Sequence, residues 1–72
     1  MSYWALKETI YKDNGEVSIH ERPFRNKNEI VRSLKKAGPI YSSDIYTLTK
    51  ENEVYLEYGG FKRKFEIFEV NE

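Results

Sequence analysis

The sequence predicts a single small α+β domain spanning residues 1–72, in which an antiparallel, curled sheet packs on one amphipathic helix in the order ββαβββ. Three observations predict this class. Asn14-Gly15 separates two segments of alternating apolar and polar residues, one helical pattern follows, and Gly59-Gly60 separates two further strand-like segments. The chain has 72 residues, of which 15% are aromatic, so we expect large rings to supply much of a small core.

The first unit is predicted to be a β-hairpin of residues 4–12 and 16–22 around Asn14-Gly15, because both turn residues tolerate positive φ. A two-residue turn places the apolar side chains on one face: Trp4, Leu6, Ile10, Val17 and Ile19. A three-residue turn with Gly15 in a bulge instead pairs Lys12 with Glu16 and divides that apolar set between the two faces. Burying an aliphatic side chain contributes roughly 1.5–3 kcal/mol and a cross-strand charge pair about 0.2–1 kcal/mol, so we expect the two-residue turn.

The second unit is predicted to be a helix that begins after Asn26 and ends at Gly38-Pro39. Asn26 and Glu29 have the spacing of a capping box. Lys35 and Lys36 lie in the last predicted turn, where cations offset the helix dipole. The residues of the apolar stripe recur with helical spacing: Ile30, Val31, Leu34 and Ala37.

The rest of the chain is predicted to form a meander of three strands, Ile45–Thr49, Glu53–Tyr58 and Phe61–Val70. A loop in which Asn52 takes left-handed φ joins the first two strands. A Gly59-Gly60 turn joins the last two and sets their register.

The last predicted strand changes its apolar phase, from Phe65 and Ile67 to Phe68 and Val70. This change predicts a β-bulge near Glu66–Phe68, without which the last two apolar residues would point outward. The expected core consists of Trp4, Leu6, Ile10, Val17, Ile19, Ile30, Val31, Leu34, Leu48, Val54, Leu56, Phe65 and Ile67.

Two segments resemble parts of a winged helix-turn-helix domain. Residues 29–48, EIVRSLKKAGPIYSSDIYTL, are similar to its first two helices, and residues 54–68, VYLEYGGFKRKFEIF, are similar to its wing. The resemblance implies nucleic-acid binding and a helix over residues 42–50. The β-branched and aromatic run DIYTLT favours a strand there instead, and residues 49–53 leave no room for a recognition helix. Both a helix and a strand are possible for residues 42–50, and we expect the strand.

Composition argues against catalysis and metal binding. The chain has no cysteine and one histidine, His20, so we expect no metal, no cofactor and no enzyme activity. The N-terminal MSYWALKETI lacks the pattern of a signal peptide, and no apolar run approaches the ~20 residues that cross a bilayer, so we expect a cytoplasmic protein without membrane association. Lysine is twice as frequent as arginine, which favours an A+T-rich bacterial or phage genome.

The leading functional hypothesis is a small non-catalytic binding module that docks on another macromolecule, a protein in the first place, with self-association as a further option. Twelve basic and twelve acidic residues give zero net charge, which argues against a general polyanion binder. One helix and one sheet cannot bury all of the tyrosines, and exposed tyrosine is favoured at protein interfaces. The candidate partner-binding residues are Tyr11, Tyr41, Tyr55 and Tyr58.

The alternative hypothesis is a nucleic-acid-binding domain that uses a basic helix face and the basic C-terminal hairpin. Within YGGFKRKFEIF, alternation along a strand places Phe61 and Phe65 on one face and Lys62 and Lys64 on the other. Acidic neighbours are expected beside both lysines, so these charges are expected chiefly to keep the strand soluble. The candidate nucleic-acid contacts are Lys27, Arg32, Lys35, Lys36, Lys62 and Lys64.

Overall fold

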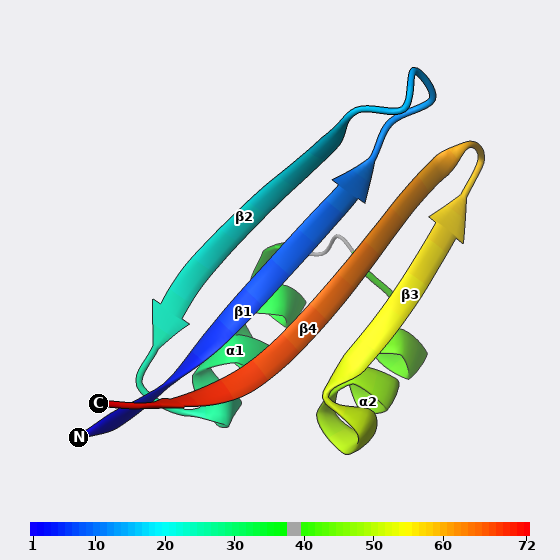
Figure 1. Ribbon diagram of the computed structural model, residues 1–72. Helices are drawn as coiled ribbons and strands as arrows, with labels where there is room; N and C mark the ends of the chain where they lie inside the picture. Colours follow the sequence, from blue (N-terminus) through cyan, green and yellow to red (C-terminus); the bar gives the residue numbers. More distant parts are fainter. Residues whose placement is uncertain (38–39) are drawn as a thin grey trace.

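The computed structural model describes residues 1–37 and 40–72, without the side chains of Tyr58 and Phe61. Its elements are β1 (Ser2–Tyr11), β2 (Val17–Phe24), α1 (Lys27–Ala37), α2 (Ser42–Glu51), β3 (Glu53–Tyr58) and β4 (Phe61–Asn71). The four strands form one antiparallel sheet, and both helices lie against the same face of it (Figure 1). The predicted α+β class with an antiparallel sheet is confirmed. The predicted order ββαβββ is wrong, because the described elements follow the order ββααββ and two helices cover the sheet.

The first and last strands form the centre of the sheet, whose strand order is β2-β1-β4-β3. They pair antiparallel along nearly their whole lengths, with Leu6 opposite Ile67 near the middle. The two ends of the chain therefore lie side by side (Figure 1). The Met1 ammonium group donates to the Glu72 carbonyl at 3.2 Å, and the Glu72 N–H donates to the Met1 carbonyl at 2.9 Å.

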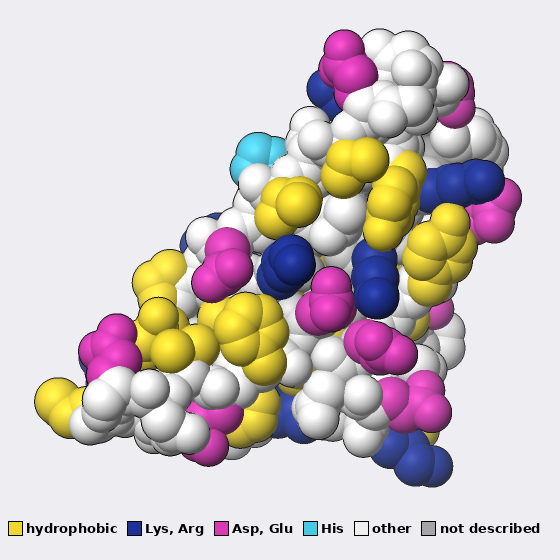
Figure 2. Space-filling model, viewed as in Figure 1, with side chains coloured by type: hydrophobic (Ala, Val, Ile, Leu, Met, Phe, Trp, Pro, Cys, Tyr) yellow, Lys and Arg dark blue, Asp and Glu magenta, His cyan; other side chains and the backbone are white. Residues whose placement is uncertain are grey.

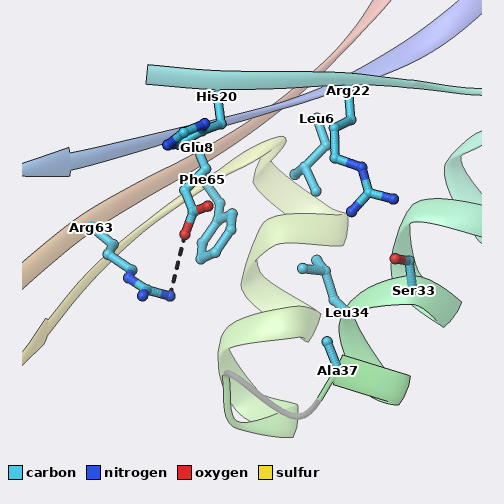
Figure 3. A pocket seen from close by; sticks show the side chains of 9 residues that line it. All are labelled: Leu6, Glu8, His20, Arg22, Ser33, Leu34, Ala37, Arg63 and Phe65. Carbon is cyan, nitrogen blue, oxygen red and sulfur yellow. Dashed lines mark ion pairs between the residues drawn. The ribbon is translucent and has the colours of Figure 1, made fainter. Parts of the chain in front are cut away.

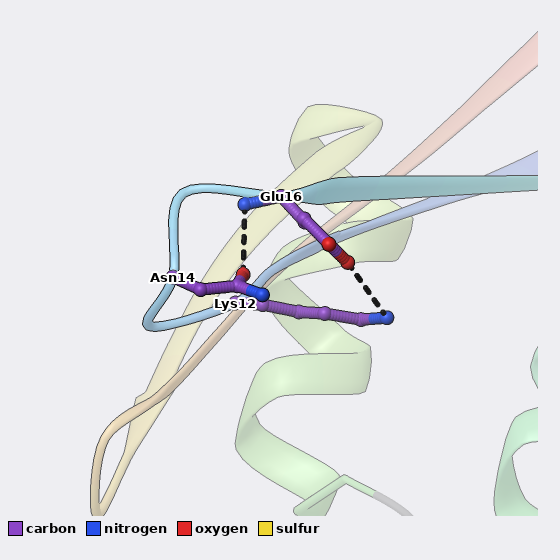
Figure 4. Close-up of polar contacts among 3 residues, drawn as sticks. All are labelled: Lys12, Asn14 and Glu16. Atoms are coloured by element: carbon purple, nitrogen blue, oxygen red, sulfur yellow. Dashed lines mark hydrogen bonds and ion pairs between the residues drawn. The ribbon is translucent and has the colours of Figure 1, made fainter.

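The turn between β1 and β2 contains three residues, Asp13 to Gly15. The Gly15 N–H donates to the Lys12 carbonyl at 3.0 Å, and the Lys12 N–H donates to the Glu16 carbonyl at 2.9 Å. Gly15 has a φ of 87°, the left-handed conformation of a type I turn that is followed by a bulge. Asn14 Oδ1 accepts the Glu16 N–H at 3.0 Å, and Lys12 Nζ lies 3.7 Å from Glu16 Oε2 (Figure 4). The predicted two-residue turn is therefore wrong.

The longer turn shifts β2 by one residue from its predicted pairing. Ile10 lies opposite Ser18, and Ile19 lies opposite Thr9. Val17 and Ile19 thus belong to the face without helices, where they are 51% and 58% exposed, and their predicted core positions are wrong. Among the hydrophobic side chains of β2, only Phe24 packs against the core, so Val17 and Ile19 do not contribute the expected burial.

Helix α1 begins where the sequence predicts. Asn26 Oδ1 accepts the Glu29 N–H at 3.0 Å, and the Glu29 carboxylate accepts the N–H of the residue before Asn26 at 3.2 Å. This reciprocal cap satisfies one backbone donor in the first turn and one just before the helix. Ile30 and Leu34 bury the apolar stripe against the sheet. The predicted end of the helix at Gly38-Pro39 lies outside the described residues.

Helix α2 replaces the predicted strand Ile45–Thr49. Ile45 and Leu48 lie three residues apart and are 5% and 1% exposed, so a helix buries both against the sheet. The Thr49 hydroxyl donates to the Ile45 carbonyl at 2.9 Å, which lets a β-branched residue fit the helix. Asn52 ends the helix with the predicted left-handed φ, 66°, and its N–H donates to the Leu48 carbonyl at 2.8 Å.

The two helices and the β3–β4 hairpin occur where the winged helix-turn-helix resemblance implies them. Asn52 alone separates α2 from β3, so there is no recognition helix between these two described elements. Neither α1 nor α2, the helices of the described ranges, is long and apolar enough to span a membrane.

The β3–β4 hairpin has the predicted register around Gly59-Gly60, with Leu56 opposite Arg63. Strand β4 then continues in unbroken register along β1, so the predicted β-bulge is wrong. As expected for a strand without a bulge, Phe68 and Val70 lie on the face away from the helices.

The core lies between the helices and the sheet. Trp4, Phe24, Val31 and Ile40 are partly buried around it. Ile45 of α2 also belongs to the core. The expected core did not include this residue, which was predicted to lie in a strand. The buried cluster consists of Leu6, Ile30, Leu34, Ile45, Leu48, Val54, Leu56, Phe65 and Ile67.

Candidate functional site

The sheet face that the helices leave uncovered is the candidate functional site, and we call it the open face. Figure 2 shows this face with one group of hydrophobic side chains near the hairpin turns, another nearer the chain ends, and charged side chains between them. Its side chains alternate along each strand with those that face the helices. They belong to Tyr3, Ala5, Lys7, Thr9, Tyr11, Val17, Ile19, Glu21, Pro23, Glu53, Tyr55, Glu57, Lys62, Lys64, Glu66, Phe68 and Val70.

The hydrophobic group near the turns, the upper band, consists of Tyr11, Val17, Ile19 and Tyr55. Strand register places Tyr11 opposite Val17. Tyr11 of β1 and Tyr55 of β3 come from the strands on either side of β4, and their ring centroids are 6.4 Å apart with an interplanar angle of 47°. Tyr55 is 53% exposed. The upper band is therefore a cluster of aromatic and aliphatic side chains that remains open to solvent.

A charged band separates the upper band from the hydrophobic side chains near the chain ends. In it, Lys7 lies between Glu21 and Glu66, and Glu53 lies opposite Glu66. Lys64 Nζ lies 3.8 Å from Glu53 Oε2, an exposed pair of the kind that contributes about 1 kcal/mol or less. The open face has no basic surplus, since its charged residues are three lysines and four glutamates: Lys7, Lys62, Lys64, Glu21, Glu53, Glu57 and Glu66.

Two of the four predicted partner-binding tyrosines, Tyr11 and Tyr55, come together in the upper band. Tyr41 does not join them, because it is the N-cap residue of α2 in the helix layer, where it is 68% exposed. The side chain of Tyr58 lies outside the described part of the chain. Tyr46, on α2, is a further exposed tyrosine of the helix layer.

The predicted nucleic-acid contacts are divided between the two layers. Lys62 and Lys64 lie on the open face. Lys27 lies in the helix layer, where its Nζ donates to Asn52 Oδ1 at 2.7 Å and stands 5.5 Å from the centroid of the Trp4 ring. The other three also lie on α1: Arg32, Lys35 and Lys36. The structure does not bring the six basic residues into one surface.

The lysines of β4 have aromatic neighbours that come from other strands. Phe65 of the same strand is buried in the core, on the opposite side of the sheet from Lys62 and Lys64, as predicted. Tyr11, however, lies opposite Lys62, and Tyr55 lies opposite Lys64. Each lysine therefore has a ring on one neighbouring strand, an arrangement that no single segment of the sequence displays.

Val17 and Ile19 are open-face residues that the sequence prediction placed in the core. The sequence did contain a signal for this placement. A three-residue turn pairs Lys12 with Glu16, and this pairing moves the two aliphatic residues to the face opposite Leu6.

The described residues contain no group of three or more histidine, cysteine, aspartate or glutamate side chains that could hold a metal ion. His20 is exposed on β2, on the face that looks toward the helices. The absence of cofactors and of enzyme activity remains a prediction.

A scan against protein-family models and searches of curated proteins and of solved structures found no match. The chemistry and geometry of the open face are therefore the basis for a functional assignment.

Proposed function

We propose that this chain is a non-catalytic binding module that docks on another protein through its open face. The observation that carries the proposal is the upper band, in which Tyr11 and Tyr55 lie together beside exposed Val17 and Ile19. Single exposed apolar side chains are ordinary, whereas adjacent ones mark interaction surfaces. Tyrosine adds a large rigid ring that loses little conformational entropy on contact.

The charges beside the upper band define the kind of partner. In the charged band, Lys7 lies between Glu21 and Glu66, and Glu53 lies opposite Glu66. A complementary protein surface presents apolar residues to the upper band and lysine or arginine to the glutamates. A standard interface buries roughly 800 Å² on each partner.

Site-specific photo-crosslinking in the native host tests the proposal. A crosslinking residue replaces Tyr55 on the open face or, as the matched control, Tyr46, which is 67% exposed in the helix layer. We expect one protein to be captured from position 55 and not from position 46. Capture of the same proteins from both positions, or of none from position 55, contradicts docking through the open face.

Binding of the captured protein after purification provides the second measurement. We expect Tyr55→Ser combined with Ile19→Ser to raise Kd by about tenfold or more, while Tyr46→Ser leaves it unchanged. An interface centred on apolar contacts should change Kd by no more than about threefold between about 50 and 200 mM salt. A concentration-dependent dimer in size-exclusion chromatography that Ile19→Ser abolishes would instead identify a second copy of the chain as the occupant.

A second candidate function is the binding of single-stranded nucleic acid to the same face. The proximity of Tyr11 and Tyr55 to Lys62 and Lys64 favours it, since rings can stack on bases while lysines contact phosphates. The four glutamates of the open face oppose it. The test is a mixed-sequence oligonucleotide: affinity that is measurable at about 50 mM salt, falls steeply by about 200 mM and disappears in Lys62→Gln/Lys64→Gln would favour this function over protein docking.

A further inference from the structure

A groove on the other side of the sheet, between the strands and helix α1, forms a second candidate site. Its volume is about 240 Å³. Figure 3 shows Glu8, His20 and Arg63 on three different strands, with Arg22 extending toward Ser33 of α1. None of these side chains belongs to the open face, so the groove is independent of the proposed docking surface.

The groove exists because the strands extend beyond the helices toward the turns (Figure 1). Along the helix-facing side of β1, Trp4 and Leu6 pack at the core, and the next residue on that side is Glu8. The same change occurs along β4, where Phe65 is followed toward the turn by Arg63. Charged side chains thus replace apolar ones where helix cover ends, and they stand directly beside the core.

Three charged side chains set the electrostatics of the groove. Arg63 Nη1 lies 3.2 Å from Glu8 Oε2, and this pair is neutral overall. The Arg22 guanidinium lies 5.3 Å from the centroid of the Phe24 ring. Within the described ranges, Arg22 has no carboxylate at ion-pair distance. Glu8, Arg22 and Arg63 together therefore give the groove one net positive charge, supplied by Arg22.

The remaining walls are apolar. Leu6, Leu34 and Phe65 line the groove and also belong to the buried core. Arg22 itself is exposed, and the low-dielectric walls beside it concentrate its field in the groove.

We propose that this groove binds a monoanionic carboxylate that carries a small apolar body. The planar guanidinium of Arg22 matches a carboxylate with two parallel N–H donors, and the apolar body lies against Leu34 and Phe65. One negative charge neutralises the groove, whereas a dianionic phosphate leaves excess negative charge beside Glu8. The volume is below the roughly 300–1,000 Å³ of pockets for drug-sized ligands, so the ligand is small.

Titration of the full-length chain with sodium benzoate, followed by amide NMR, tests the site. We expect saturable shifts around Leu34 and Phe65, with benzamide, the neutral analogue, and phenyl phosphate, the dianion, each binding about tenfold more weakly or worse. Arg22→Gln should weaken the binding of benzoate by about tenfold or more. The matched control Arg32→Gln, on α1 but outside the groove lining, should leave it unchanged. Shifts that do not saturate, equal binding of benzamide, or unchanged affinity in Arg22→Gln would overturn the proposal.

A second variant keeps the test informative if Arg22→Gln does not fold. Glu8→Gln raises the net charge of the groove from one to two, so phenyl phosphate should gain at least about tenfold in affinity relative to benzoate. An unchanged preference between the two anions would also overturn the site. Tyr55→Ser should leave benzoate binding intact, which separates this proposal from docking through the open face.

The carboxylate can come from a free acid or from the C-terminus of a peptide. An acetylated dipeptide that ends in phenylalanine, compared with its C-terminal amide, distinguishes these sources. If the dipeptide acid binds more tightly than benzoate, the site is assigned to peptide C-termini. If benzoate binds more tightly, the site is assigned to free acids. Both results support a carboxylate site. Equal binding of the dipeptide acid and its amide, together with unsaturable benzoate shifts, would contradict it.

Discussion

Lys12 and Glu16 close the first hairpin together, through a backbone hydrogen bond of 2.9 Å and a side-chain ion pair of 3.7 Å. Their pairing adds one residue to the turn. Because side chains alternate along a strand, that single residue moves Val17 and Ile19 from the core side of the sheet to the open face. Half of the upper band therefore depends on the geometry of one turn.

Gly15→Ala should destabilise the protein by about 1 kcal/mol or more. Gly15 has a φ of +87°, and no atom lies within 4 Å of the position that a Cβ would take, so the cost comes from the backbone conformation alone. Gly15→Asn is the control and should cost less, since asparagine tolerates left-handed φ. Chemical denaturation measures both. Equal stability of Gly15→Ala and wild type would contradict the three-residue turn.

Ile19→Ala and Ile30→Ala remove the same atoms from opposite environments, since Ile19 is 58% exposed and Ile30 is 0% exposed. We expect Ile30→Ala to lower the free energy of unfolding by about 2–5 kcal/mol and Ile19→Ala by less than about 1 kcal/mol. Urea denaturation of both variants measures the difference. Comparable losses of unfolding free energy in the two variants would indicate that Ile19 is a core residue and would contradict the observed register of β2.

Leu48→Ala and Tyr46→Ala distinguish helix α2 from a strand. In a strand these two side chains share a face, whereas in the helix Leu48 is 1% exposed and Tyr46 is 67% exposed. The helix predicts a loss of about 2–5 kcal/mol for Leu48→Ala and less than about 0.5 kcal/mol for Tyr46→Ala. Thermal unfolding followed by circular dichroism is the measurement. A large loss from Tyr46→Ala would count against the helix.

Asn52 has two roles that substitution can separate. Its backbone takes a φ of 66° at the end of α2, and its Oδ1 accepts a hydrogen bond of 2.7 Å from Lys27 Nζ. Asn52→Gly retains the left-handed backbone and loses only the exposed hydrogen bond, so we expect a change within about 0.5 kcal/mol. Asn52→Ala should cost about 1 kcal/mol or more. A reversed order of the two variants in urea denaturation would show that the side-chain bond is the larger contribution.

The elements predicted correctly are those with local signals. The Gly59-Gly60 turn sets the register of β3 and β4, and the cap formed by Asn26 and Glu29 sets the start of α1. Helix α2 was not predicted because its β-branched residues favour a strand, while the burial of Ile45 and Leu48 against the sheet favours the helix and outweighs that preference.

The candidate site was predictable only in part. Tyr11 and Tyr55 were named from the sequence as exposed aromatic residues, and the register of Tyr55 with Lys64 follows from the β3–β4 turn. The proximity of Tyr11 to Tyr55 depends on the pairing of β1 with β4, which joins the two ends of the chain. No local pattern encodes a contact over that sequence separation, so the composite surface emerges only from the assembled sheet.

The central position of β1 and β4 also determines when during synthesis the domain can form. The ribosome makes β1 before the other three strands of this sheet and β4 after them, yet β4 must enter between β1 and β3 to complete the sheet. Before that, the β1–β2 hairpin stands without its central partner, and an isolated two-stranded hairpin is marginally stable in water. The edges of β1 and β3 remain unpaired during this interval and can pair with neighbouring nascent chains. The sheet can therefore close only after β4 has been made, and β4 then covers at once the edges of β1 and β3 that face it.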